Sequence, residues 1–286
     1  MSALRIARFE WKRLRLAPGI LLASLLLAGV IAGGTLIPHL GLDDPPVDYG
    51  VAFLLGPGTE LLLPLVAVLL SYGAIAALKE RGTLSLFLGA PNRRFDVFVG
   101  VLIGRITVAL TMTVVALLTA IGVIIVVYGF PSLRTVGAFI LFTGFATVAY
   151  TTIGVAVSAS VTNRIRAVTI LVAGVFIFHT LWSGMLQLLH YLLTGSYPHS
   201  ESAWWFDSLH TLSPLEAYST TVNWVLPPSP HLFVAVDDSG IDAETGDMVG
   251  GGVTTGEATF AIAILAAWIL GSFLIGLYRF NTREFS

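Results

Sequence analysis

The sequence predicts an all-α membrane protein with six transmembrane helices. Of its 286 residues, 56% are apolar and only 11% are charged, whereas soluble domains have about 45–50% apolar and about 25% charged residues. Mean hydropathy is +0.87. A bilayer core is about 30 Å thick and requires about 20 apolar residues per helix. Six runs meet this requirement: 17–38, 61–78, 97–128, 135–157, 167–193 and 258–278.

The first element is an amphipathic helix over residues 3–16, which we expect to lie along the membrane as an elbow. Its apolar residues recur at helical spacing, and Pro18 marks a break before the first span. That span is too long an apolar stretch for a cleaved signal peptide, so we interpret it as retained. A simple topogenic signal remains the alternative for the charged residues. The elbow residues are Arg5, Arg8, Trp11, Lys12 and Arg15.

Residues 79–96 connect the second and third spans and carry an unusual apolar stretch. Thr83 is a plausible N-cap for a short helix ending at Leu88, before Gly89-Ala90-Pro91. Such an apolar stretch in a cytoplasmic loop is expected to be buried, either in the membrane interface or in a groove on a partner. The third span contains Arg105, which we expect to extend to the lipid headgroups.

A long acidic insert, residues 191–257, separates the last two spans. It contains nine acids and no Lys or Arg. The residues Trp204-Trp205-Phe206 favour an interfacial or re-entrant element, and turn signals after 232–236 favour a small β-hairpin. Asp237 does not begin a calcium-binding loop pattern. A solvated extracytoplasmic loop is the simplest interpretation.

Charge is distributed asymmetrically between the ends of the predicted spans. Thirteen of the fifteen basic residues flank one side, and thirteen of the seventeen acids lie in 39–60 and 191–257. Lys and Arg mark cytoplasmic segments. The chain is therefore predicted to be a multi-pass protein of the cell membrane with both termini cytoplasmic.

Several chemistries are disfavoured by the residues that the chain lacks. It has no cysteine, and therefore no thiolate nucleophile. It also lacks the P-loop and H-E-x-x-H motifs. Its net charge of −2 offers no basic surface for nucleic acid. Ser183 has no histidine partner in the last span, and His179 and His190 share one face of span 5 without metal-ligand spacing. We predict no catalytic, cofactor or metal site in this chain.

No Asp or Glu lies deep inside any predicted span. Ion-coupled transporters usually require ionisable groups near the membrane midplane. If the protein moves a substrate against a gradient, its energy is therefore expected to come from outside the membrane region.

Four segments, in this order, resemble the permease subunit of a type-2 ABC transporter. They are RFEWKRLR, ERGTLSLFLGAPNRRFDVFVGVLIGR, SPLEAY and YRFNTREF. The nearest likeness is to the branch that serves nitrous oxide reductase maturation. The acidic insert departs from the short hairpin that this family often has there.

The resemblance implies a dimer, with a second copy or a homologue, on two ABC ATPase subunits that bind Mg-ATP. It implies that the following residues couple the spans to the ATPase: Glu80, Arg81, Gly82, Thr83, Pro91, Arg93 and Arg94.

The whole chain is thus predicted to be one permease domain of an exporter that works by alternating access. An intramembrane enzyme and an ATPase-independent carrier or scaffold are the alternatives. The sequence does not identify the substrate.

Overall fold

The computed structural model describes most of the membrane region. The described residues are helical apart from turns and short connections, and no strand occurs among them. The hairpin expected after 232–236 lies outside them. The described ranges are 3–15, 17–37, 47–52, 54, 58–80, 82, 93–197, 204–225 and 253–282.

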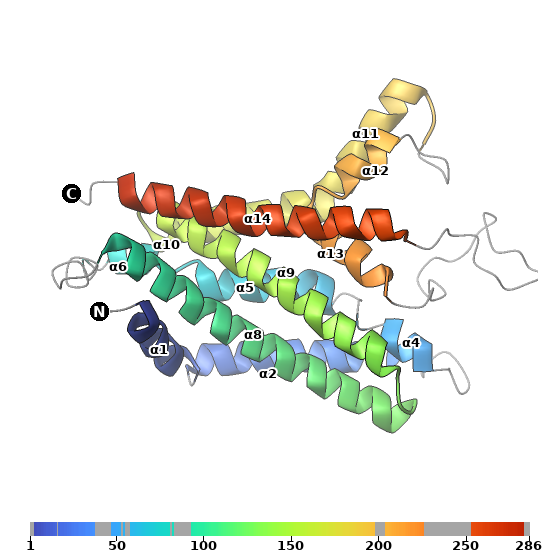
Figure 1. Ribbon diagram of the computed structural model, residues 1–286, viewed down its shortest axis with the longest axis horizontal. Coiled ribbons are helices and arrows are strands. Elements are labelled where there is room, and N and C mark those ends of the chain that lie inside the picture. The colour runs from blue at the N-terminus through green and yellow to red at the C-terminus, as the bar shows by residue number, and fades with distance from the viewer. Residues whose placement is uncertain are drawn as a thin grey trace, which may run out of the picture.

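The long helices lie side by side along the longest axis of the molecule, with α1, α6 and the last turn of α14 at one end (Figure 1). The helices of this bundle are α1 (Ala3–Leu14), α2 (Pro18–Gly34), η1 (Gly58–Leu62), α5 (Leu63–Ser71), α6 (Ala76–Glu80), α8 (Arg94–Val127), α9 (Leu133–Ser160), α10 (Arg164–Phe176) and α14 (Thr255–Thr282). A short α4 (Val47–Ala52) follows α2.

Among the residues that the structure describes, five helical segments are long and apolar enough to cross a membrane, and a sixth is formed if α1 and α2 are one span bent by 75°. The chain is therefore a multi-pass membrane protein, as predicted; the exact number of six remains a prediction. The predicted runs agree with the helices to within a few residues. The third run becomes α8, a single helix of 34 residues, which at about 1.5 Å per residue is about 51 Å long and exceeds a bilayer core.

Helix α1 packs against α8 at two glycines. A Cβ on Gly100 would lie 2.7 Å from the carbonyl oxygen of Ala3, and a Cβ on Gly104 would lie 2.6 Å from the Cβ of Glu10. The two helices can approach this closely only because both positions lack a side chain. Gly100 and Gly104, which form a G-x-x-x-G pair, therefore determine where α1 packs on α8.

The expectation that Arg105 reaches the headgroups is wrong. Its side chain is buried, with Nη2 3.3 Å from Oε2 of Glu10, and Nη1 donates to the carbonyl of Leu70. The glycine contact brings Glu10 onto α8 beside Arg105, so the guanidinium finds a carboxylate inside the protein. On the face of α1 that packs against the protein, Ile6, Ala7, Glu10 and Leu14 are buried, whereas Leu4 is exposed.

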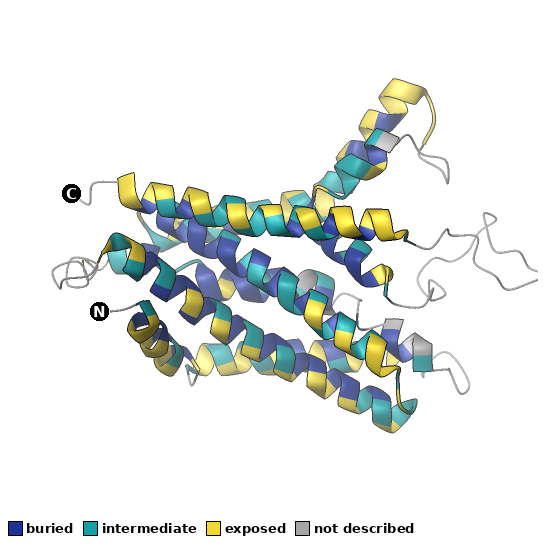
Figure 2. Cartoon of the chain, in the orientation of Figure 1, coloured by how far each residue is buried: buried dark blue, intermediate teal, exposed yellow. Residues whose placement is uncertain are grey.

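Small residues bring the central helices together in the same way. Gly154 of α9 faces Ser71 of α5, and Gly276 of α14 lies against Ala156 of α9, where an added Cβ would be 2.8 Å from the Ala156 Cα. Buried faces point into the bundle and exposed apolar faces point outward (Figure 2), as expected for helices surrounded by lipid.

The fifth span is continuous but contains one turn of π-helix. It consists of α10, η2 (Ile177–Leu181) and α11 (Trp182–Thr194), and ends at Gly195, which has a φ of 75°. Two short helices follow, α12 (Trp204–His210) and α13 (Pro214–Asn223). Helices α11 and α12 project from the bundle (Figure 1), whereas α13 packs against α9 and α14.

Candidate functional site

The predicted coupling segment begins where α6 ends and is tied to the neighbouring spans. The Nε of Arg164 is 3.0 Å from Oε2 of Glu80, and the backbone N–H of Arg164 also donates to this oxygen. Lys79 donates to the carbonyl of Val161 at 3.2 Å. The end of α6 is thus attached to the connection between α9 and α10.

The far end of the coupling segment is attached to a different helix. The guanidinium of Arg94 donates to the carbonyl oxygen of Asn281 near the end of α14, at 2.8 Å. Arg93 is exposed before the first turn of α8, and Gly82 is exposed with a φ of 65° that favours glycine. The remaining predicted residues, Arg81, Thr83 and Pro91, lie outside the described residues.

A buried serine holds the break between α5 and α6. The hydroxyl of Ser158 in α9 accepts from the N–H groups of Ile75 and Ala76, both at 3.0 Å, and donates to the carbonyl of Tyr72 at 2.8 Å. A helix break in lipid leaves backbone groups that must be satisfied by neighbouring helices. This role could not be predicted from the sequence, because Ser158 is about eighty residues from its partners.

The basic side chains of the predicted elbow helix point away from its buried face. Arg5, Arg8, Lys12 and Arg15 are exposed, and Trp11 is half-buried. They are available to anionic lipid headgroups or to a partner.

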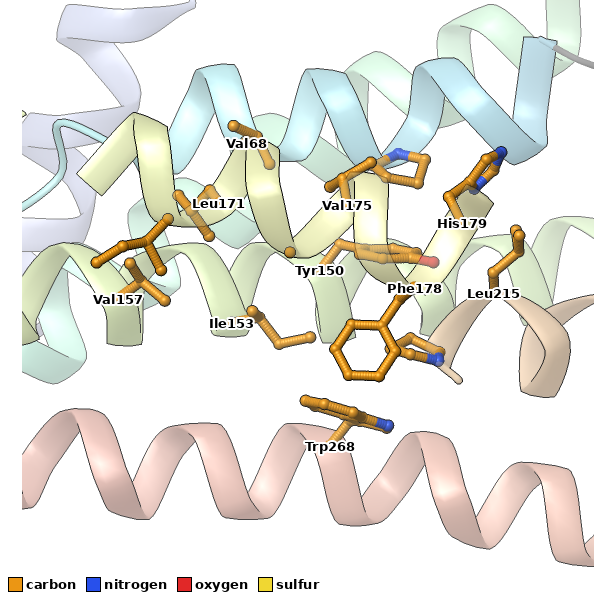
Figure 3. Close-up of a pocket in the computed structure, with 14 residues that line it drawn as sticks. Val68, Tyr150, Ile153, Val157, Leu171, Val175, Phe178, His179, Leu215 and Trp268 are labelled. Atoms are coloured by element: carbon orange, nitrogen blue, oxygen red, sulfur yellow. The ribbon is translucent and has the colours of Figure 1, made fainter. Parts of the chain in front are cut away.

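A cavity of about 150 Å³ lies between α5, α9, α10–η2, α13 and α14 (Figure 3). Its wall is mostly aliphatic and aromatic, and includes Tyr150, Phe178 and Trp268. The rings of Phe178 and Trp268 meet edge to face, with centroids 5.4 Å apart. Both residues also line a second, larger hollow of about 470 Å³ between η2, α11 and α14. The aromatic pair therefore separates the two spaces.

Polar groups face the pocket at its α13 end. Nδ1 of His179 is buried and has no hydrogen-bond partner among the described residues. The carboxylate of Glu216, next to the pocket residue Leu215, interacts electrostatically with both His179 and Tyr150. Helix α13 thus brings the carboxylate of Glu216 beside the pocket. Glu216 lies in the insert and outside every predicted apolar run, so nothing in the sequence indicated this position.

A second carboxylate lies near this end of the pocket. Glu60 is half-buried in η1, before α5 begins. Burial raises the pKa of Glu60, and repulsion by Glu216 raises it further. Glu60 and Glu216 are thus close enough to repel each other. The lining of the nearby pocket contains no Lys or Arg among the described residues.

Ser183, His210 and Glu216 form a polar cluster beside the pocket. Ser183 Oγ is 3.1 Å from His210 Nε2 and 3.3 Å from Glu216 Oε1, and His210 Nδ1 is 3.5 Å from Glu216 Oε2. Trp182 Nε1 donates to the carbonyl of Leu209 at 3.2 Å. The cluster joins α11, α12 and α13.

This cluster resembles a nucleophile, base and acid, although sequence reasoning found no histidine for Ser183. Acyl transfer also requires donors for an oxyanion. The N–H of Trp182 is bonded to the carbonyl of Ile177 within the helix, and Ser183 lies inside the same continuous helix. The hydroxyl of Ser183 donates to Oε1 of Glu216, which ties α11 to α13. The arrangement suits a structural latch.

The histidines do not gather as metal ligands in the described part of the chain, where no group of three or more potential ligands was found. Nδ1 of His190 is 3.0 Å from the carbonyl of Ser196, and its ring stacks on Trp205 with centroids 5.7 Å apart. His190 therefore packs α11 against α12.

The family profile for ABC-2 family transporter proteins matches residues 13–285. The match covers nearly the whole chain, so the chain belongs to this family and is a membrane-spanning permease subunit of an ABC transporter. No curated protein matches it.

Proposed function

We propose that this chain is the permease subunit of an exporter driven by a separate Mg-ATP-hydrolysing ABC ATPase, in a complex with a second permease copy or homologue. Both termini lie in the cytoplasm in this proposal. The likeness to the nitrous oxide reductase maturation branch remains a prediction.

The observation that carries the proposal is that the two ends of the coupling segment are attached to two different helices. Glu80 contacts Arg164 at the start of α10, and Arg94 contacts Asn281 at the end of α14. A displacement of residues 80–94 by an ATPase would therefore act on α10 and α14 together. Such movement performs transport only if substrate binds the two resulting states with different affinity.

The energetics favour a coupling role over a stabilising one. The side chains of Glu80 and Arg164 are 40% and 44% exposed, and exposed ion pairs contribute about 0–1 kcal/mol to stability. We expect Glu80→Gln and Arg94→Gln to leave the thermal unfolding temperature within about 2 °C, and to reduce substrate transport per ATP hydrolysed. Arg134→Gln, on an exposed residue at the opposite end of α9, is the matched control.

The test is a reconstituted vesicle assay that measures ATP hydrolysis and transport in the same sample. Uncoupling in both variants, with Arg134→Gln unaffected, supports the proposal. Wild-type coupling in both would remove these residues from the coupling surface. The chain purified from its native membrane in mild detergent should also carry an ATPase, and its reproducible absence would contradict the partner assignment.

The alternatives make different predictions in the same vesicles. An ATPase-independent carrier would give flux without the ATPase or ATP, and a scaffold would give none under any condition. The Ser183 cluster makes an enzyme worth testing directly. Peptide or ester hydrolysis by the purified chain that is lost in Ser183→Ala would favour the enzyme.

A further inference from the structure

We propose that the cavity between α5, α9, α10–η2, α13 and α14 binds an organic cation with a small apolar or aromatic body. The inference rests on the transport function proposed above and names the class of substrate. It comes from the lining of the cavity and from the charges and aromatic rings around it.

The cavity has the position and size for a small ligand. Its α10–η2 lining runs from Ile170 to His179, which lies about 9–22 Å along the helix axis from Arg164, within a bilayer core about 30 Å thick. A cavity of about 150 Å³ has room for a body the size of a benzene ring. An apolar body would replace empty space against Val68, Leu171 and Val175.

One end of this apolar cavity contains a polar atom without a hydrogen bond. The buried Nδ1 of His179 has no partner among the described residues, and a buried polar atom without a partner is unfavourable. A ligand with one polar head could therefore place its body among the aliphatic side chains and its head near His179.

The charge of that head follows from its surroundings. Glu216 follows the lining residue Leu215, and its carboxylate contacts Ser183 and His210 beside the cavity. No Lys or Arg lines the cavity among the described residues, so an anionic head would find no counter-charge in its wall. The pocket also presents the rings of Tyr150, Phe178 and Trp268 (Figure 3), and aromatic faces attract cations.

The edge-to-face pair of Phe178 and Trp268 provides an entrance. Both rings line the cavity and the larger hollow beside α11 and α14. Trp268 is held by a hydrogen bond from Nε1 to the carbonyl of Leu212 at 3.0 Å, and the carbonyl of Phe178 accepts from Ser213 at 3.3 Å. A rotation of Phe178 alone would join the two spaces without moving a helix.

The test measures binding of radiolabelled benzylammonium to the full chain in nanodiscs, without ATPase or ATP. The competitors are ethylbenzene, in which carbon replaces the charged nitrogen, and phenylmethanesulfonate, an anion with the same ring. We expect saturable binding, weak displacement by the neutral isostere and none by the anion. Equal displacement by the neutral isostere, or no saturable binding, would overturn the proposal.

Two pairs of variants locate the site. Gly174 lines the cavity and a Cβ there meets nothing within 4 Å, so Gly174→Leu should fill the cavity without strain and abolish binding. Gly184 has equally open surroundings but does not line the cavity, so Gly184→Leu should bind normally. We expect Glu216→Gln to weaken binding about tenfold, and Glu257→Gln, an exposed charge change at the start of α14, to have no effect.

Normal binding in Gly174→Leu would place the probe elsewhere and overturn the assignment. Because binding is measured without ATPase, it can fail while ATP-driven transport is retained, which would contradict only the substrate class. Binding without any ATPase-dependent transport would contradict the proposed function and leave the site intact.

Discussion

Arg105 shows how strongly a single charge can determine the packing of this bundle. Its guanidinium is buried against Glu10, and Glu10 is also 2.9 Å from Arg13. Removing one partner of a buried ion pair typically costs about 3–5 kcal/mol, because the other charge remains buried. We therefore expect Arg105→Met to lower the thermal unfolding temperature by several degrees.

A double-mutant cycle separates the pair from its surroundings. Glu10→Met combined with Arg105→Met should regain at least half of the loss seen in Arg105→Met alone, because no uncompensated charge is left. Additive losses would mean that each side chain is stabilised by other contacts. Thermal unfolding of the purified chain in one detergent is the measurement.

Glu60 predicts how stability depends on pH. Its pKa is raised above the ordinary value of 4.5, first by burial and then by Glu216. Between the pKa of Glu60 in the unfolded chain and its higher pKa in the folded chain, the folded chain binds more protons than the unfolded chain. The free energy of unfolding therefore falls as pH rises through this interval. We expect Glu60→Gln to flatten the decline above pH 4.5, measured as unfolding temperature against pH. An unchanged slope would contradict a role for Glu60, and Glu257→Gln is the control.

Among the elements, the α1–α8 contact depends on the absence of two side chains. A Cβ on Gly100 or Gly104 would come within 2.7 Å of α1, so α1 must move if either residue becomes alanine. Gly122 lies on the same helix with nothing within 4 Å. We expect Gly100→Ala and Gly104→Ala to increase protease cleavage within residues 3–15, while Gly122→Ala does not. Equal cleavage in all three variants would show that Gly100 and Gly104 do not determine the packing of α1.

The helices were easier to predict from sequence than the contacts between them. Apolar runs locate α8 and α9 to within a few residues, because lipid requires continuous apolar surface wherever the chain crosses it. Nothing local to Arg105, Ser158 or Glu216 reveals a partner, since each partner comes from another segment. The amphipathic pattern of α1 predicted a helix but not the helix against which it packs, because Gly100 and Gly104 belong to another segment.

At the scale of the whole molecule, the charge asymmetry predicts an orientation that can be tested without background labelling. The chain has no cysteine, so each introduced cysteine is a single reporter. Ser132 and Thr282 are both exposed, at the start of α9 and the end of α14. A membrane-impermeant maleimide should label Ser132→Cys in intact spheroplasts and Thr282→Cys only after lysis. The opposite pattern would invert the proposed topology.

The buried ion pair between Glu10 and Arg105 also affects the order in which the helices can pack during synthesis. The two residues are 95 positions apart, and ribosomes add about 5–20 residues per second. Glu10 is therefore made about 5–20 s before its buried partner Arg105. During that interval Glu10 has only the part-exposed Arg13 as an ion-pair partner, and α1 lacks its contact with Gly100 and Gly104, so the acid must remain in water or at the headgroups. Helix α1 can thus dock only after the third long segment has been made.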